Sequence, residues 1–319
     1  MAGATTTAKL PRRLSREGVL LVVLLALVVV FAIASPLFLG NLLNTSRSYV
    51  EVGLVALGMT LIVVSGGIDL SVGALLALVS VVVGFASANG VPLVLALVLG
   101  LVVGVACGAF NGAFITLLDL NPLVVTLGTF ALFRGLAFVV SNAGAVSSFP
   151  DWFAVFGQYY LGPVPLQLFL LVAAAIGIGL MLARTRYGRY VFAIGHNPRA
   201  VRFSGVPVGR VVLSLYAVMG LLVAVAAIIY TSRVSSARPD SGLGLELDVI
   251  AAVVLGGASI RGGSGTILGT MLGVCIIAVL RNGLFMAGVS ATWTLVAVGV
   301  ALIVAVFVNE AFRGRADDG

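Results

Sequence analysis

The sequence predicts an all-α membrane protein, a bundle of about ten transmembrane helices. Hydrophobic residues make up 61% of the chain and charged residues only 9%, and the mean hydropathy is +1.22. A soluble domain usually carries about 25% charged residues. Apolar runs near the length needed to cross a hydrocarbon core of about 30 Å recur along the whole chain. These runs are apolar on all sides, so they favour spanning helices over helices that lie on a membrane surface.

The apolar runs place the expected spans in order along the chain. They cover 18–39, 51–66, 70–88, 92–118, 122–142, 163–183, 211–232, 246–260, 264–283 and 290–309. The second and eighth are short for a bilayer, and both lead into glycine-rich breaks at 65–73 and 256–265. We therefore expect an N-terminal tail (1–17), a transmembrane domain (18–309) and a C-terminal tail (310–319).

The basic residues predict the orientation in the membrane. If the N-terminus is inside, thirteen Lys and Arg residues fall in inner segments, six of them between 184 and 210, and four fall outside. An excess of Lys and Arg in cytoplasmic loops sets orientation, so both termini are expected in the cytoplasm. The net charge of +7 is thus interpreted as an orientation signal, and no nucleic-acid partner is expected.

Two parts of the sequence resemble each other and suggest an inverted repeat. IDLSVGALLAL (68–78) can be aligned with LELDVIAAVVL (245–255), and GVACGAFNG (104–112) with GTMLGV (269–274). Two halves of five spans each would then enter the membrane in opposite senses, as in many transporters. Glycines four apart in both segments allow close helix contact. The alternative is chance matching of two segments rich in Gly, Ala and Val.

The residues that catalysis requires are scarce. The only lysine is Lys9, in the N-terminal tail, so the chain has no glycine-rich loop with a phosphate-binding lysine. The only histidine has no acidic neighbour, and the two cysteines lie in apolar runs without other metal ligands. We therefore expect no enzyme, no metal site and no cofactor. If ATP drives this protein, a separate subunit hydrolyses it.

The charged residues near the membrane bear on the transport mechanism. Five acidic residues are expected at span ends or glycine breaks and none within an unbroken span: Glu51, Asp69, Asp119, Glu246 and Asp248. An ion-coupled transporter usually holds a carboxylate deep in the bilayer. Arg134 is the one charge expected within a span, and either structural pairing or a role in a pathway explains it.

The break SGGIDLSVG (65–73) is the most specific stretch. Gly66 and Gly67 permit non-helical backbone, and Asp69 or Ser71 can cap a helix that begins near Val72. The break is either a capped turn at the inner face or a broken helix that lines a translocation path. Irregular backbone at membrane depth is tolerated only where it is buried or wet.

The stretch GHNPRAVRFSG (195–205) predicts a short basic helix between two spans. Asn197 can cap it, Pro198 suits its first turn and Gly205 can end it. Arg199 and Arg202 lie three residues apart and share a face. Such a helix either docks onto a soluble partner or holds anionic lipid headgroups. The cap and the stop favour docking.

Four long stretches together resemble the ribose-type permease subunits of bacterial ATP-binding-cassette (ABC) sugar importers. They are ALGMTLIVVSGGIDLSVGALLAL (56–78), NPLVVTLGTFALFRGLAFV (121–139), GRYVFAIGHNPRAVRFSGV (188–206) and ELDVIAAVVLGGASIRGGSGTILGTMLG (246–273). The resemblance covers residues 45–308 in the same order. Arg261 departs from the pattern, because a small or polar residue is expected there.

The resemblance implies a permease in the bacterial inner membrane that works as a homodimer or heterodimer. Its expected partners are a cytoplasmic ATP-hydrolysing subunit and an external sugar-binding protein. Segment 184–210 resembles the segment that couples such permeases to the ATPase. The candidate coupling residues are Asn197, Pro198, Arg199, Val201, Arg202, Phe203 and Gly205.

The sequence analysis therefore predicts a transport subunit for a monosaccharide, such as a pentose. Hydroxyl, amide and carboxylate groups can bind a polyol, and the candidate pathway residues are Asp69, Ser71, Asn111, Thr126 and Thr129. The alternatives are a branched-chain amino acid or nucleoside ABC permease, a ten-span secondary transporter, and a membrane scaffold or receptor subunit.

Overall fold

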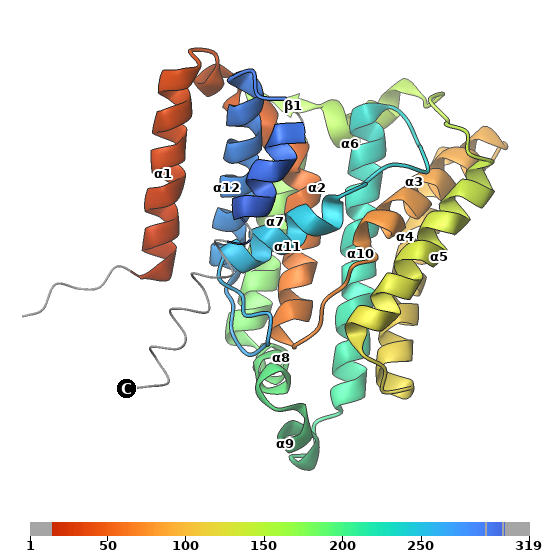
Figure 1. Ribbon diagram of the computed structural model, residues 1–319. Helices are drawn as coiled ribbons and strands as arrows, with labels where there is room; N and C mark the ends of the chain where they lie inside the picture. Colours follow the sequence, from red (N-terminus) through yellow and green to blue (C-terminus); the bar gives the residue numbers. More distant parts are fainter. Residues whose placement is uncertain (1–14, 291, 302, 304–319) are drawn as a thin grey trace, which may run out of the picture.

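The computed structural model describes residues 15–290, 292–301 and 303, and this part of the chain is almost entirely helical (Figure 1). The long helices are α1 (Arg16–Ala34), α2 (Phe38–Val64), α4 (Leu93–Leu117), α5 (Pro122–Ser141), α7 (Leu166–Arg184), α10 (Val208–Val234) and α12 (Ile267–Met286). Each is long and apolar enough to cross a membrane. Two shorter helices, α3 (Val72–Ala88) and α11 (Leu245–Leu255), lie among them, and a last apolar helix covers 292–301.

The remaining elements lie at the two ends of the bundle. Short helices α8 (Arg186–His196) and α9 (Pro198–Phe203) extend beyond one end in Figure 1. At the opposite end, η1 (Asp151–Ala154), α6 (Val155–Gln158) and the antiparallel strands β1 (Tyr160–Leu161) and β2 (Val164–Pro165) connect α5 to α7. Under the predicted orientation, the α8–α9 end is cytoplasmic, and it is called the inner end below.

Each of the ten expected spans contains a helix, although the tenth continues beyond the described residues. The expected second span (51–66) was too short, because α2 begins at Phe38 and is continuous for 27 residues. Its polar first half is satisfied within the protein: Arg47 Nε donates to the Gly157 carbonyl (2.8 Å). The first span ends at Ala34, not residue 39, just before Pro36, which disfavours helix continuation.

The bundle has the two-fold organisation that an inverted repeat predicts. Helix α2 packs against α11 and α12, and α10 packs against α3 and α4. In Figure 1, α2 runs toward the inner end, whereas α10 runs away from it. Helices α3 and α11 both begin near the centre of the bundle, after non-helical connections at 65–71 and 235–244. The breaks thus leave two shorter helices, α3 with 17 residues and α11 with 11.

Glycines bring helix backbones into close contact in both halves. A Cβ atom added to Gly108 of α4 would overlap the Tyr216 carbonyl oxygen of α10. A Cβ atom added to Gly273 of α12 would overlap the Ala252 carbonyl oxygen of α11. The expected close contact is therefore confirmed at both aligned stretches. The helices that these glycines contact differ in length, because Gly108 of α4 meets the long helix α10 and Gly273 of α12 meets the short helix α11.

Candidate translocation and coupling sites

The connection 65–71 is a true helix break. Helix α2 ends at Val64, where Gly66 adopts a φ of +89° and Gly67 N donates to the Ile62 carbonyl (2.9 Å). The backbone then stays non-helical until α3 begins at Val72. Water is scarce at membrane depth, so such backbone must find its hydrogen-bond partners inside the protein. The stretch is therefore a break between two helices, and its role in lining a translocation path stays a prediction.

Three of the candidate pathway residues form one buried cluster. Asp69 Oδ1 accepts hydrogen bonds from the Ser71 amide (2.9 Å) and the Ser71 hydroxyl (2.6 Å). Asn111 of α4 donates through Nδ2 to the Ser71 oxygen (2.9 Å). All three side chains are at most 2% exposed, and Asn111 Oδ1 has no partner within the described residues. The cluster thus fixes the start of α3 to α4.

The expected helix cap differs in detail. Ser71 occupies the N-cap position of α3, but its side chain makes no capping hydrogen bond. Asp69 does not bind the first turn of α3 either; it accepts from the amide of Ser71 itself. The reason is that the Ser71 hydroxyl is already engaged by Asp69 and Asn111. The carboxylate therefore shapes the approach to the helix rather than its first turn.

The two threonine candidates lie on α5 beside this connection. Thr126 Oγ1 donates to the Pro122 carbonyl within the helix (2.9 Å) and lies 3.4 Å from the Ile68 carbonyl. Thr129 is one turn further along and bonds weakly to the Thr126 carbonyl (3.4 Å). Both are buried. Four of the five candidates therefore lie within residues 68–71 or contact them, and Thr129 is more remote.

Tyr216 of α10 belongs to the same region and was missed from the sequence. Its hydroxyl donates to the Ile68 carbonyl (3.4 Å), and the residue is only 1% exposed. It lies in an otherwise apolar run, so periodicity gave no reason to single it out. The feature that could have identified Tyr216 is its phenol hydroxyl within a membrane span, because a buried tyrosine hydroxyl usually finds a hydrogen-bond partner.

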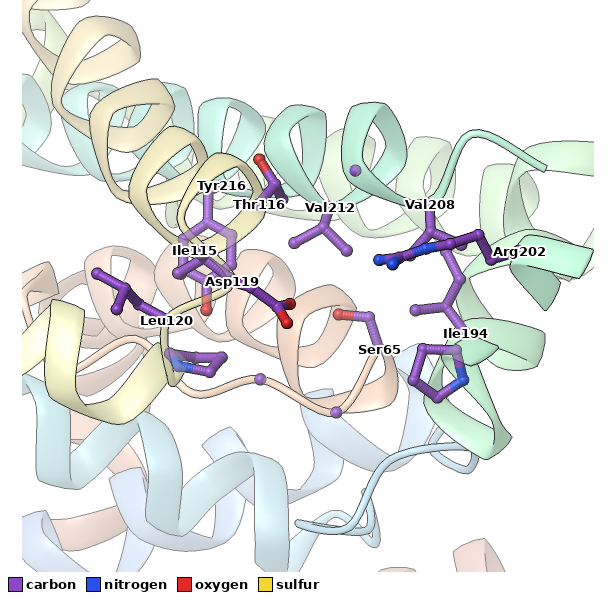
Figure 2. Close-up of a pocket in the computed structure, with 15 residues that line it drawn as sticks. Ser65, Ile115, Thr116, Asp119, Leu120, Ile194, Arg202, Val208, Val212 and Tyr216 are labelled. Carbon is purple, nitrogen blue, oxygen red and sulfur yellow. The ribbon is translucent and has the colours of Figure 1, made fainter. Parts of the chain in front are cut away.

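A cavity of about 210 Å³ lies between this region and the inner end of the protein (Figure 2). Gly67 and Tyr216 form its boundary toward the buried cluster. Figure 2 shows Ser65, Asp119 and Arg202 pointing into it from α2, the α4–α5 connection and α9. None of the five candidate pathway residues lines this cavity. In this conformation the candidates are therefore enclosed, and their role in a pathway stays a prediction.

The segment predicted to couple the protein to an ATPase folds as the sequence indicated. Asn197 Oδ1 accepts from the Ala200 amide (3.0 Å), Pro198 is the first residue of α9, and Gly205 adopts a φ of +80°. Helix α9 ends at Phe203, and none of its residues is fully buried. The short capped helix predicted over this stretch is confirmed.

The two large apolar candidates on α9, Val201 and Phe203, differ in exposure. Val201 is half-buried and packs against the core of its own chain. Phe203 is 93% exposed, the most exposed of the large hydrophobic residues in the described part of the chain. Arg199 is exposed, whereas Arg202 points into the inner cavity (Figure 2). Phe203 is thus the exposed large apolar side chain that α9 offers to a partner.

Glu51 was wrongly placed at the end of a span. It lies in the middle of α2, is 2% exposed and accepts from Arg233 Nε of α10 (2.8 Å). A buried charge in a membrane protein is tolerated when it is paired. Asp248 of α11 is likewise paired with Arg281 of α12. The Glu51–Arg233 pair joins the two halves, whereas the Asp248–Arg281 pair joins two helices of the second half, and no short sequence motif predicted either pair.

Arg134 has a structural pairing. Its Nη1 donates to the carbonyls of Pro239 (2.7 Å) and Ser241 (2.8 Å), in the connection that precedes α11. Hydrogen bonds from a charged donor are stronger than neutral ones. Arg134 of α5 therefore anchors the outer connection, 235–244.

Comparison with known proteins identifies the family. Residues 41–306 match the family described as the branched-chain amino acid transport system / permease component. The ribose import permease protein of Bacillus subtilis (strain 168) is 43% identical over 291 residues, which is 90% of both chains. The autoinducer 2 import system permease proteins of Klebsiella pneumoniae and Escherichia coli (strain K12) are each 39% identical, over 92% and 88% of this chain and 91% and 87% of theirs. No solved structure matches the chain.

A family match of this length and relatives of this similarity leave one conclusion. The chain belongs to the branched-chain amino acid transport system / permease component family, and it is a multi-pass membrane transport subunit rather than an enzyme.

Proposed function

We propose that this chain is the membrane-spanning subunit of an ABC importer and forms the translocation pathway for a monosaccharide. The observation that carries the proposal is the capped α8–α9 segment, which extends from one end of the bundle and exposes Phe203. A membrane subunit without a nucleotide-binding lysine needs such a surface to receive work from a separate ATPase. The sugar would reach the opposite end on an external binding protein.

The choice of a sugar rests on the relatives and on the chemistry of the buried cluster. The Bacillus subtilis relative imports ribose, by its name, and the other two import autoinducer 2. Asp69, Ser71 and Asn111 offer hydroxyl, amide and carboxylate groups, which bind sugar hydroxyls. The family description favours a branched-chain amino acid as the second candidate. The apolar side chain of such a substrate would form no hydrogen bonds with this polar cluster.

The proposal includes a location and an assembly. The chain lies in a bacterial inner membrane with both termini in the cytoplasm, as the distribution of Lys and Arg indicates. It pairs with a second permease subunit, identical or related. Segment 184–210 docks onto the ATPase rather than serving only as an anchor for anionic lipid.

Reconstitution with defined substrates tests the proposal. Vesicles would hold the permease with an ATPase and a binding protein of the same importer, and uptake of ribose, autoinducer 2 and leucine would be compared. We expect ATP-dependent uptake of ribose or another pentose. Uptake of leucine without any sugar would instead favour the amino acid branch of the family. Uptake of autoinducer 2 alone would keep the importer class and replace the substrate.

A further inference from the structure

Three segments that are far apart in the sequence meet at one point on the inner side of the bundle. They are the end of α2 with Gly66, the penultimate residue of α8, Gly195, and the loop residues Gly262 and Gly263 between α11 and α12. Gly263 N donates to the Val64 carbonyl (2.8 Å), which joins the first break directly to the loop before α12. We call this meeting point the glycine junction, comprising Val64, Gly66, Gly195, Gly262 and Gly263.

The backbones at this junction lie so close together that they leave no room for a Cβ atom. A Cβ atom added to Gly195 would overlap both the Val64 carbonyl oxygen and the Gly263 amide nitrogen. A Cβ atom added to Gly262 would lie 2.8 Å from the Gly195 oxygen and 3.0 Å from Gly66 Cα. No side chain separates the three segments, so displacement of one must displace the other two.

The side chain of the next residue reinforces the contact. A Cβ atom on Gly263 would lie 2.7 Å from Cε1 of His196, so the imidazole covers this glycine. The His196 Nδ1 atom lies 2.8 Å from the Phe192 carbonyl oxygen, one turn back in α8. The ring is therefore held by α8 while it touches the loop. Asn197, the cap of α9, follows immediately.

We propose that the glycine junction makes Gly195 and His196 positioning residues for transport, because they connect the ATPase-docking helix to both glycine-rich stretches, 65–73 and 256–265, at once. The proposal rests on the proposed function. When the ATPase moves α9, the end of α8 moves with it. That movement reaches Val64 and Gly66, which lead to Asp69 and α3, and Gly262 and Gly263, which lie between α11 and α12. One docking event thus acts on both halves of the repeat.

The substitution Gly195→Ala tests the proposal in the complete transporter. We expect the variant complex to bind the ATPase and hydrolyse ATP, while the sugar transported per ATP falls by about ten-fold. The milder His196→Ala, which leaves the backbone contacts in place, should lower the same ratio by about two-fold. Gly177→Ala in α7 is the matched control, because a Cβ atom there meets nothing within 4 Å. An unchanged ratio in Gly195→Ala would overturn the proposal.

A measurement on the wild-type protein decides the matter if Gly195→Ala does not insert. Hydrogen exchange of peptides covering 62–70 and 258–266 would be compared with and without the ATPase. We expect docking to change exchange in both peptides together. A change in only one, or in neither, would contradict a shared junction. Loss of ATP-dependent uptake by the wild-type complex itself would count against the proposed function instead, so the two failures are distinguishable.

Discussion

Two non-helical connections precede the shorter helices α3 and α11, and different contacts hold each connection in place. The inner connection (65–71) leads to α3 and is held by short side chains, with Asp69 bound to Ser71 and Ser71 bound to Asn111. The outer connection (235–244) leads to α11 and is held by the guanidinium of Arg134. It is also paired by backbone hydrogen bonds to the loop after α5, in both directions between Val146 and Ala237.

This difference indicates which connection moves. The outer connection is fixed to two other parts of the chain, and one of these attachments carries a full charge. Among the described residues, the inner connection is linked to other helices by one short side-chain hydrogen bond, from Asn111 to Ser71, and by two longer ones to the Ile68 carbonyl, and it touches the coupling segment through the glycine junction. Under an inverted repeat the two connections occupy equivalent places, so their different attachments reflect different tasks. We infer that the inner connection transmits movement and the outer one resists it.

The largest effect is expected from Asp69→Asn. The amide keeps an oxygen that accepts from Ser71, but the acidic group at the break is lost. Loss of a capping-type interaction costs about 0.5–2 kcal/mol, which leaves the protein folded. Transport should fall by about ten-fold or more, a typical coupling effect. Uptake rates at matched protein levels check this, and normal uptake would reduce Asp69 to a turn residue.

Arg134→Met should act on stability more than on mechanism. It leaves the Pro239 and Ser241 carbonyls without their charged donor, which costs about 1.5–3 kcal/mol per lost charged hydrogen bond. The expected result is a lower unfolding temperature and faster hydrogen exchange across 235–244, with the transport per ATP preserved. If instead the transport per ATP falls while stability is unchanged, the outer connection is the moving one.

Changes on α9 should show how the ATPase reaches the inner connection. Phe203→Asp should reduce recovery of the ATPase in a pull-down by about ten-fold, because exposed aromatic anchors dominate interfaces. Arg199→Ala with Arg202→Ala should weaken binding by only about 0–1 kcal/mol for each lost pair, and the loss should depend on salt. A lipid anchor predicts the reverse order, with the arginines dominant and ATPase recovery unaffected by either change.

The smallest effect is expected from Arg238→Ala, in the outer connection. Arg238 pairs with Asp240 through two hydrogen bonds (2.9 and 2.8 Å), but both side chains are exposed. The Arg238 guanidinium lowers the pKa of the Asp240 carboxyl. Exposed ion pairs contribute little, so neither stability nor transport should change measurably. A clear loss of stability or transport would mean that Arg134 and the Val146–Ala237 hydrogen bonds are not sufficient to hold this connection.

The sequence predicted the parts of the protein that depend on local chemistry. Hydropathy located a helix within each of the ten expected spans, seven of them long and apolar enough in the described part of the chain to cross a membrane, and the Asn-Pro cap with its glycine stop located α9, because these signals lie within a few residues. The extent of α2 was missed because its polar first half is satisfied by distant partners, such as Gly157 for Arg47. Tyr216, the Glu51–Arg233 pair and the glycine junction were missed for the same reason. Contacts between remote segments leave no periodic signal in a single chain.

The sequence predicted no carboxylate within an unbroken span, a feature that argues against an ion-coupled transporter. Glu51 in the middle of α2 removes that argument. The pairing of Glu51 with Arg233 and the family membership are the observations that distinguish this chain from an ion-coupled transporter.

The energy source for uptake therefore tests the central claim most directly. Vesicles would hold the permease with its binding protein and sugar, and uptake would be measured with ATP and the ATPase subunit, or with an imposed proton or sodium gradient alone. We predict uptake only when both ATP and the ATPase are present, and none from either gradient. Uptake driven by an ion gradient through this polypeptide alone would contradict the account.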